Sequence, residues 1–369
     1  MAPIFIIIIA LIQAILAFAH FLVYKTLVSV FSISTGPTLT ALRIVFAILA
    51  VSFVASSVAS FRFYNPAVSV FYTVTAVWLG FLLYLFLAAC LYWLGVVVLG
   101  WLAPLASTAL LGHMLLVLAV LVGIYGVANN LRLVITPLII QLPSLPAELV
   151  GKKVVWVSDI HLGQIYSVSF LDKIVAKIQT LKPDMILVGG DVYDGGAFPT
   201  DSAIPVLAKL QAPLGTYFIT GNHEEFGDNA KYLTAIRAAG ITILNNEKID
   251  VHGLQLIGVD YNDTTSRSNY ESIIKSLAID KNKPSILLKH APTALDIAEQ
   301  TGVNFQISGH THRAQMWPLN FITWLVYKGF DFGLHNFGRM TVYTSSGVGT
   351  WGPPLRVGSP SEIVLIELK

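Results

Sequence analysis

Charge is almost missing from the first third of this 369-residue chain. Residues 1–131 carry only three charged side chains, which are Lys25, Arg43 and Arg62, and all 21 acidic residues lie from Glu148 onward. Because a water-soluble fold needs charged and polar side chains on its surface, this scarcity favours a membrane region over an ordinary globular domain. A buried helical core is the remaining alternative for these residues.

The chain also has almost no cysteine, and its C-terminal part has no excess of basic residues. Cys90 is the only cysteine, so no intramolecular disulfide can form, which fits a reducing compartment. From Glu148 to the C-terminus the chain has 19 Lys and Arg against 21 Asp and Glu, a net charge of about −2. We therefore expect no nucleic-acid partner, because such a partner needs clustered positive charge.

Long apolar runs, in contrast, are abundant. Four are long enough to cross a bilayer, which takes about 20 residues each, and they cover roughly residues 3–24, 39–61, 68–102 and 106–127. The third, about 35 residues long, is either one tilted helix or two short passes. The first is alternatively a signal peptide cleaved after Ala19, although it lacks a basic n-region. We predict a multi-pass helical membrane region over 1–131, with about four spans.

Basic side chains near the ends of these runs set the expected orientation. With four spans, both termini fall on one side, together with Arg62, Arg132, Lys152 and Lys153. The positive-inside bias then predicts that the C-terminal domain lies in the cytoplasm. An odd number of spans would reverse the relation between the termini.

The charged part of the chain alternates between strands and helices. Residues 132–147 are predicted to form an extended linker, because Pro137, Pro143 and Pro146 disfavour helix in themselves and in the residue before. The alternation predicts that residues 148–369 form an α/β sandwich with sheets inside and helices outside. Strands are expected at 153–158, 185–188, 216–220, 241–244, 254–259, 285–288, 305–308, 340–344 and 362–368, and helices at 167–180, 203–209 and 229–239.

Five short polar motifs follow five of these strands. Because the carboxyl ends of strands in open α/β folds gather at one edge of the sheet, we expect the motifs to share one site. They are Asp159-Ile160-His161, Gly190-Asp191, Gly221-Asn222-His223-Glu224, His290 and Gly309-His310-Thr311-His312.

The polar side chains of these motifs are typical metal ligands. Carboxylates suit hard ions and imidazoles suit borderline ones, so the mixture indicates Mn²⁺, Fe or Zn²⁺. A lone His is more often structural and an Asp after a strand is often a helix cap, but five of the nine histidines fall in this ordered set. The histidines outside it are His20, His113, His252 and His335. Seven ligands are more than one ion needs and suit two: Asp159, His161, Asp191, Asn222, His290, His310 and His312.

A two-metal site of this kind suits displacement at phosphorus. Two ions about 3.5–4 Å apart hold the attacking and leaving oxygens and lower the pKa of bound water. His223 lies next to Asn222 without being needed as a ligand. It is therefore the candidate to protonate the leaving oxygen or to stabilise charge on the phosphoryl group.

The motifs, in this order, resemble the signature of the calcineurin-like metallophosphoesterases: Asp-x-His, Gly-Gly-Asp-x-x-Asp, Gly-Asn-His-Glu, His and Gly-His-Thr-His. The resemblance covers about 148–369 and implies a four-layer αββα fold, a dinuclear metal centre and hydrolysis of phosphate esters or anhydrides. Mn²⁺ is the favoured ion. By the same resemblance, Asp159, His161, Asp191 and His312 hold one metal, Asp191, Asn222, His290 and His310 hold the other, and His223 is catalytic.

The tail from Thr341 to Arg356 resembles membrane-anchored bacterial members of that family. These include phosphodiesterases and a UDP-2,3-diacylglucosamine pyrophosphatase, so the resemblance implies a bacterial plasma membrane. Two departures leave the substrate open: Arg313-Ala314 replaces an expected Gly-Gly, and Ser346 stands where an arginine is common. Arg313 either grips a phosphate or is simply exposed.

Aromatic residues are dense over 316–332, directly after two of the expected ligands. One interpretation is an apolar patch beside the site that dips into the membrane interface, with Lys328 and Arg339 near the headgroups. The other is that these aromatics pack a second core or dock on the membrane helices.

The leading hypothesis is a membrane-bound, metal-dependent phosphohydrolase that cleaves a phosphodiester or pyrophosphate bond. A lipid-linked substrate such as UDP-2,3-diacylglucosamine is favoured, and the sequence leaves the oligomeric state open. A phosphomonoesterase or protein phosphatase is the alternative among enzymes, and a membrane receptor that keeps the fold is the alternative outside them. The complete ligand set and His223 argue against the receptor, and the few polar residues in the apolar runs argue against a transporter.

Overall fold

The computed structural model of the chain describes residues 2–102, 108–225 and 229–369. It divides into two compact units. One comprises residues 1–128 and 352–355, and the other comprises residues 129–351 and 356–369. They are called the helical unit and the α/β unit below.

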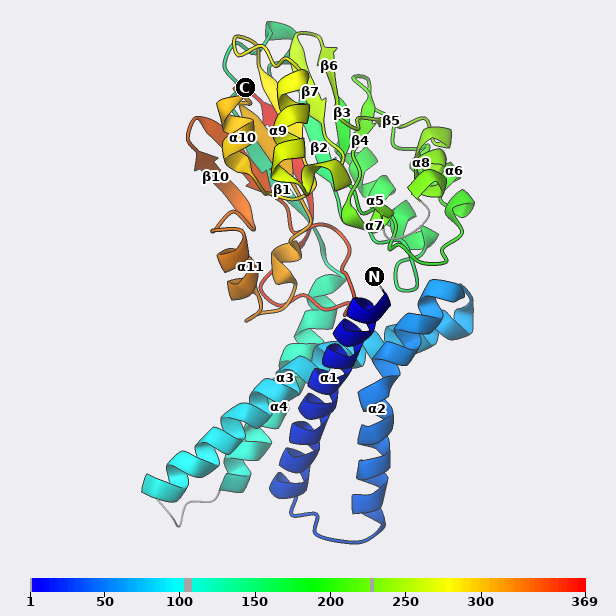
Figure 1. Cartoon of the computed structure of the whole chain (residues 1–369), viewed down its shortest axis with the longest axis vertical. Helices are drawn as coiled ribbons and strands as arrows, with labels where there is room; N and C mark the ends of the chain where they lie inside the picture. The colour runs from blue at the N-terminus through cyan, green and yellow to red at the C-terminus, as the bar shows by residue number, and fades with distance from the viewer. Residues whose placement is uncertain (1, 103–107, 226–228) are drawn as a thin grey trace. The chain divides into compact units, whose positions relative to one another are not determined.

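The helical unit is built from four long helices (Figure 1): α1 (Ala2–Val30), α2 (Pro37–Arg62), α3 (Pro66–Leu102) and α4 (Thr108–Asn130). Each is long and apolar enough to cross a membrane, with a mean hydropathy of 2.3 to 2.5. The expectation of four long apolar helices is confirmed. The third apolar run forms one continuous helix of 37 residues. Residues 106 and 107, where the fourth run was expected to begin, lie outside the described residues.

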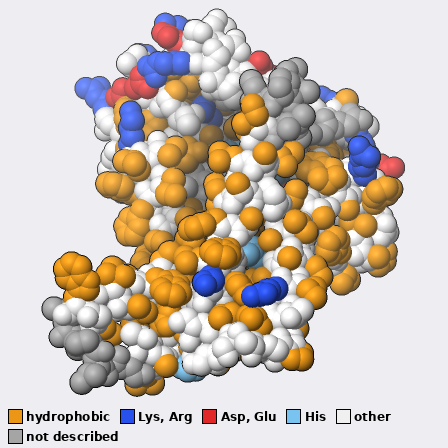
Figure 2. All heavy atoms as spheres, turned by 60° about the horizontal axis from the view of Figure 1, so that its bottom comes forward, with side chains coloured by type: hydrophobic (Ala, Val, Ile, Leu, Met, Phe, Trp, Pro, Cys, Tyr) orange, Lys and Arg blue, Asp and Glu red, His pale blue; other side chains and the backbone are white. Residues whose placement is uncertain are grey.

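The surface of the helical unit is apolar. Figure 2 shows hydrophobic side chains over most of its visible face, with few basic groups among them. Leu11, Leu94 and Leu110 are each at least 60% exposed. A buried helical core is therefore the wrong alternative for these helices, because such a core would hide these side chains.

Polar side chains inside the helical unit pair across helices. Ser56 and Thr75 oxygens lie 2.7 Å apart, and the Trp78 indole donates to Nε2 of His20 at 2.9 Å. Small residues allow close approach, since a Cβ on Gly112 would lie 2.2 Å from the Val30 side chain. Interhelical hydrogen bonds and small residues at contacts are the usual means by which apolar helices associate in lipid.

Two six-stranded sheets form the centre of the α/β unit (Figure 1). The first, in the order β1-β12-β2-β3-β4-β5, contains β1 (Leu133–Ile140), β2 (Lys153–Val157), β3 (Met185–Val188), β4 (Thr216–Phe218), β5 (Thr242–Ile243) and β12 (Ser361–Leu368). The second, in the order β10-β11-β9-β8-β7-β6, contains β6 (Glu247–Val251), β7 (Leu254–Gly258), β8 (Ser285–Leu288), β9 (Phe305–Ser308), β10 (Gly333–Phe337) and β11 (Met340–Thr344).

Helices cover the outer face of each sheet, which gives four layers. Helices α5 (Val168–Thr180), α6 (Ile204–Leu207) and α8 (Asn229–Ala238) pack on the first sheet, while α9 (Arg267–Ser276) and α10 (Leu295–Gln300) pack on the second. Two short helices, α7 (Asn222–Glu225) and α11 (Asn320–Val326), complete the unit. The expected αββα sandwich is confirmed.

Successive side chains of a strand point to opposite faces of the sheet, so each strand of the first sheet contributes to two cores, one under the helices and one between the sheets. Val155 and Val157 of β2 face the helices, whereas Val154 and Trp156 face the second sheet. The core between the sheets is mainly apolar, because both faces of these strands are buried. Glu362 of β12 is an exception, and its carboxylate accepts hydrogen bonds from Tyr343 and Thr136.

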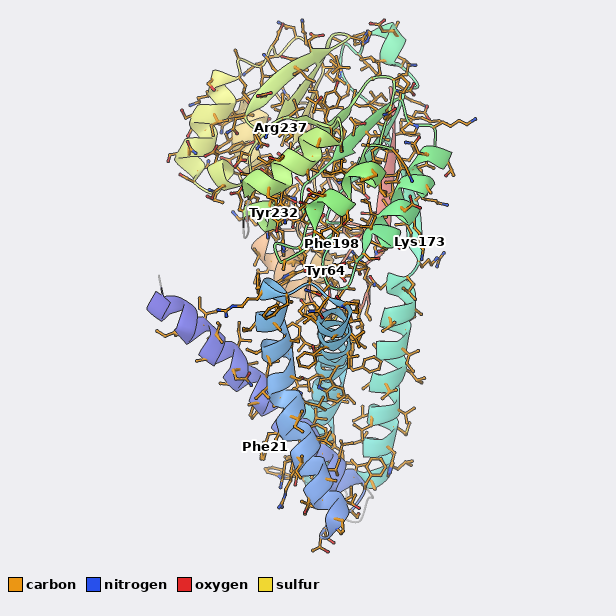
Figure 3. The ribbon with its side chains drawn as sticks, turned by 90° about the vertical axis from the view of Figure 1, so that its right-hand side faces the viewer. Phe21, Tyr64, Lys173, Phe198, Tyr232 and Arg237 are labelled. Atoms are coloured by element: carbon orange, nitrogen blue, oxygen red, sulfur yellow. The ribbon has the colours of Figure 1, made fainter. Side chains whose placement is uncertain are left out.

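On the helix side of the first sheet, the ring of Tyr193 lies between those of Phe198 and Tyr232, at 6.0 and 4.8 Å. Tyr232 points inward from α8, while Lys173 of α5 and Arg237 of α8 are exposed (Figure 3). These helices are therefore amphipathic, with one apolar stripe against the sheet.

The residues expected to form a linker differ from that prediction. Leu133–Ile140 forms β1 and pairs in parallel with β12 over its whole length. Pro137 is tolerated there because β1 is the edge strand of the first sheet, where a missing N–H removes no ladder hydrogen bond on the open side. The strand was missed because its partner lies more than 220 residues away in the chain.

Candidate metal centre

The five motifs follow β2, β3 and β4 in the first sheet and β8 and β9 in the second. Within each group the strands run parallel, so their carboxyl ends meet at one edge. The two sheets face each other across an apolar core, which brings the two edges together. As a result, all seven expected ligands and His223 converge, although they come from five separate segments.

Backbone strain is concentrated at this edge. Asp159, His161, Asp191, His310 and His312 all have positive φ, between 49° and 69°. Residues other than glycine enter this region at a cost of order 1–3 kcal/mol each, and such outliers cluster at functional sites. The strain directs five polar side chains into one small volume instead of along the strand direction.

Two glycines of the motifs are required by close approach. A Cβ on Gly221 would lie 2.2 Å from Oδ1 of Asp191, and one on Gly309 would lie 2.4 Å from Oδ2 of Asp159. Any larger residue at either position would displace a carboxylate.

The ligand-type side chains form two adjoining groups. In the first, Nε2 of His312 lies 3.0 Å from Nε2 of His161 and 3.6 Å from Oδ1 of Asp159. These three side chains offer ligand atoms within 4.8 Å of one another.

In the second group, Nε2 of His290 lies 3.2 Å from Oδ2 of Asp191. Oδ1 of Asn222 lies 2.7 Å from Nδ1 of His310 and 3.2 Å from Nε2 of His290. Oδ2 of Asp191 also lies 3.9 Å from Nε2 of His161, so this carboxylate faces both groups.

The charges of these groups fit divalent cations. Asp159 and Asp191 are 0% and 2% exposed, and within the described part of the chain neither forms an ion pair with a Lys or Arg. Burial raises the pKa of Asp159. It opposes ionisation of Asp191 as well, but His290, His223 and His161 outweigh it and hold the pKa of Asp191 well below its usual range.

The histidines complete this donor set. Burial and neighbouring cations lower the pKa of His310 to about 3, and burial also holds that of His312 well below its usual value. Both imidazoles are therefore neutral near pH 7 and offer nitrogen lone pairs, as metal ligands must. Buried carboxylates with neutral imidazoles and an amide oxygen form a mixed oxygen and nitrogen set that suits Mn²⁺, Fe or Zn²⁺.

His223 has the opposite electrostatic character. It is buried at the start of α7, its backbone N–H donates to Oδ1 of Asp191 at 2.8 Å, and its Nδ1 lies 3.3 Å from Oδ1 of Asp194. Burial lowers the pKa of His223, but Asp191 and Asp194 outweigh burial and raise that pKa to about 9. The imidazole is therefore positively charged at neutral pH, as a proton donor requires.

Two acidic residues at this site were not singled out from the sequence. Oδ1 of Asp194 lies 3.3 Å from Nδ1 of both His161 and His223. The buried carboxylate of Glu224 accepts backbone N–H groups of Gly221, Asp191 and Val192, each at 2.8 Å, and so ties two motifs together. Asp194 ends the Gly-Gly-Asp-x-x-Asp motif and Glu224 ends the Gly-Asn-His-Glu motif, so their place in these motifs could have identified them from the sequence.

Arg356 is a further residue that sequence reasoning missed. Its guanidinium is fully buried and donates to the carbonyls of Ser346 at 2.8 Å, Gly347 at 3.1 Å and Gly349. A Cβ on Gly347 would lie 2.6 Å from Cβ of Asp159. Arg356 therefore holds the loop that backs one of the ligands.

Arg313, which replaces an expected glycine, is held by the protein. Its Nη1 donates to the carbonyl of Gly358 at 2.8 Å, and its guanidinium lies 4.7 Å from the centre of the Phe332 ring. Its φ is 50°, which a glycine would adopt without strain.

The aromatic segment after the ligands exposes its apolar side chains. Of the described residues 320–326 that form α11, none is buried, and Leu325 is 71% exposed. The expectation that these side chains pack a second core is therefore wrong for α11. The segment nevertheless adjoins the ligands, because the ring of Tyr327 lies 6.2 Å from that of His310.

The remaining histidines lie outside this centre. Nδ1 of His252 is 3.4 Å from Glu148, and Nε2 of His335 is 2.8 Å from the carbonyl of Phe332. His20 and His113 belong to α1 and α4.

Comparison with known proteins adds family relationships. A family model described as calcineurin-like phosphoesterase matches residues 152–314. An uncharacterized metallophosphoesterase of Aquifex aeolicus is 30% identical over 258 residues, which cover 68% of this chain and 98% of that protein. A Bos taurus protein described as a transmembrane protein with metallophosphoesterase domain is 32% identical over 255 residues, covering 64% of this chain and 57% of the relative.

An uncharacterized metallophosphoesterase of Campylobacter jejuni is 34% identical over 234 residues, 62% of each chain. The chain thus spans less than two thirds of the length of several curated relatives that it matches.

Proposed function

Since the chain belongs to the calcineurin-like metallophosphoesterase family, we propose that it is a membrane-bound, metal-dependent phosphohydrolase that cleaves a phosphodiester or pyrophosphate bond. The observation that carries the proposal is the convergence of seven ligand-type side chains in two adjoining groups beside a positively charged His223. A receptor that merely kept the fold would need no proton donor at this position.

The two groups support a proposed division of the ligands. Asp159, His161, Asp191 and His312 would hold one divalent ion, and Asp191, Asn222, His290 and His310 would hold the other, with Mn²⁺ as the favoured ion. When bound, the ions neutralise charge on the phosphoryl oxygens and lower the pKa of a water molecule. Positive-φ backbone directs the ligand side chains toward one another. The carboxylate of Glu224 accepts the backbone N–H groups of Asp191 and Gly221 and so fixes the positions of two motifs.

His223 supplies the proton for the leaving group. As the phosphorus–oxygen bond breaks, the leaving oxygen takes a proton from the imidazolium, which avoids release of a high-energy alkoxide. Nδ1 of His223 lies against Asp194, so Nε2 is the donating atom. Asp194 is a positioning residue, because it orients the ring and favours its charged form.

An amphiphilic, lipid-linked substrate fits the surroundings best. The exposed apolar residues of α11 and the ring of Tyr327 adjoin the second ligand group. A cavity of about 540 Å³ between α11 and α10 is lined mainly by apolar residues, together with Lys328 and the ion pair of Arg267 and Asp296. UDP-2,3-diacylglucosamine combines a pyrophosphate with two acyl chains and is therefore a suitable first substrate.

The hydrolase proposal is tested with purified protein loaded with Mn²⁺ and a bis-aryl phosphodiester. His223→Ala should remove turnover while metal content measured by mass spectrometry stays at two ions per chain. His252→Ala, an exposed histidine outside the centre, is the matched control and should keep full activity. No turnover of any phosphoester with metal bound would overturn the proposal, and faster turnover of an aryl phosphomonoester would favour the phosphomonoesterase alternative.

The proposed location is a bacterial plasma membrane crossed by all four helices, with the α/β unit in the cytoplasm. Four crossings put both termini on one side, and the basic residues near the start of the α/β unit favour the cytoplasmic side. A variant with Cys90→Ser and Ser202→Cys has its one thiol at an exposed position of the α/β unit. A membrane-impermeant maleimide should label it only after cell lysis, and labelling in intact cells would reverse the orientation.

A further inference from the structure

The helical unit contains a polar cluster and a cavity that the hydrolase proposal does not use. Arg43 on α2 has its Nε 3.1 Å from the hydroxyl of Tyr24 on α1, to which it donates. The other N–H groups of the Arg43 guanidinium have no hydrogen-bond partner among the described residues. Beside it lies a cavity of about 310 Å³ lined by Ala17, His20, Phe21, Tyr24, Arg43, Phe46, Ala47 and Ala50.

Arg43 has no negative partner within its own unit. Residues 1–131 contain no Asp or Glu, so no side chain of the four helices can neutralise the guanidinium. An ionisable residue at membrane depth is expensive without a partner and usually marks a functional site. The counter-charge must therefore come from outside the helices.

The depth of Arg43 places its guanidinium near lipid phosphates. The 26 residues of α2 are about 39 Å long, while the hydrocarbon core is about 30 Å thick, so about 4 Å of helix extends beyond the core at each end. Arg43 lies six residues, or about 9 Å, from the start of α2. Its backbone is then about 5 Å inside the core, and its long side chain reaches the headgroup level.

The cavity changes from polar to apolar with depth. Arg43 and Tyr24 lie at its shallow end, whereas Ala17 and Ala50 are each seven residues, or about 10 Å, further into the core. The amide of Gln13 donates to the carbonyl of Ala50 at 2.8 Å, which joins the two helices at the deep end. Phe21 projects from the side of the helices (Figure 3) and is 57% exposed, so it borders the opening toward lipid.

We infer that this cavity binds one anionic phospholipid, with its phosphate on the Arg43 guanidinium and the hydroxyl of Tyr24 and the start of an acyl chain over Ala47 and Ala50. The guanidinium offers several N–H donors to phosphate oxygens in a charge-assisted contact. The small alanines leave room for the chain. The inference rests on the proposed insertion of the helices and is independent of hydrolysis.

The test is native mass spectrometry of the full chain released from detergent containing phosphatidylglycerol. We expect one retained lipid per chain, and at least about tenfold weaker retention in Arg43→Gln, because the variant loses the charge-assisted hydrogen bonds to the phosphate. Lys25→Gln is the matched control, since Lys25 is one residue from Tyr24, carries the same charge and does not line the cavity. Inorganic phosphate alone should not displace the lipid, because it lacks the apolar part.

Ala50→Phe fills the deep end without touching the charge and should weaken retention as well. This variant decides the question if Arg43→Gln fails to fold, and the helical circular dichroism and melting temperature of the full chain in detergent report on folding of both. Equal retention by Arg43→Gln and the parent chain would overturn the inference. So would equal losses in Arg43→Gln and Lys25→Gln, which would mean general attraction to positive charge, and so would displacement by inorganic phosphate.

Discussion

Replacing Asp194 by Asn tests whether this carboxylate holds His223 in its charged form, provided that variants are compared at equal metal loading, because Asp194 also contacts the proposed ligand His161. The carboxylate lies 3.3 Å from Nδ1 of His223 and, with Asp191, raises the pKa of that histidine to about 9. Removing one opposite charge at this distance lowers the pKa of an imidazole by about 1 unit or more. The fraction of protonated His223, and therefore turnover above the new pKa, falls about tenfold for each unit.

The sign of the pH effect follows from the raised pKa. A general acid must carry its proton, so activity is present below the pKa of His223 and is lost as pH rises through it. In Asp194→Asn this loss should begin at lower pH than in the parent chain. KM for a soluble phosphodiester should change little, because Asp194 is not proposed to contact the substrate.

The measurement is the pH profile of kcat at equal metal loading for the parent chain, Asp194→Asn and Asp201→Asn. Asp201 is an exposed acid seven residues further along the chain and serves as the matched control. An unchanged alkaline limb in Asp194→Asn would refute the role assigned to Asp194. A similar shift in Asp201→Asn would show that net charge, and not the contact, sets the pKa of His223.

Three further predictions concern the metal centre and its surroundings. Gly221→Ala should lower metal content and activity together, because its Cβ would lie 2.2 Å from Oδ1 of Asp191 and overpacking costs about 1–3 kcal/mol; normal metal content would contradict the steric argument. Leu325→Ser on α11 should reduce turnover of a vesicle-embedded substrate about tenfold, since burial of a leucine contributes about 1.5–3 kcal/mol, and should leave a soluble phosphodiester unaffected. Val150→Ser changes another exposed apolar residue, which precedes β2 at the opposite end of that strand, and should affect neither substrate. Chelation with EDTA should abolish turnover, and Mn²⁺ should restore it while Mg²⁺ restores less; full recovery without added metal would rule out a dependence on divalent ions.

Much of the fold could be predicted because its signals are local. Runs of about 20 apolar residues predict membrane helices, and the alternation of strands with amphipathic helices predicts an α/β sandwich. The nine predicted strands all occur in the structure. Strand β10 was missed because its residues are largely exposed, and α9 was missed because its apolar stripe is short.

The chemical identity of the candidate site was likewise present in the sequence. Asp159, Asp191 and the histidines of the motifs could be selected by residue type and by their position after apolar strands. Their electrostatic roles could not be read in this way. His223 and His310 are the same residue type, yet the pKa of one is raised to about 9 and that of the other is lowered to about 3.

The sequence by itself determined the positions of the four apolar helices and of nine strands along the chain, and the set of polar residues that follow five of these strands. Each of these features is set by residues that are close together in the chain. Only the tertiary structure decided that β1 completes the first sheet, that Asp194 faces His223, that α11 is exposed and that Arg43 borders a cavity. The physical reason is that pKa values, cavities and exposure depend on contacts between residues far apart in the chain, which a local pattern does not record.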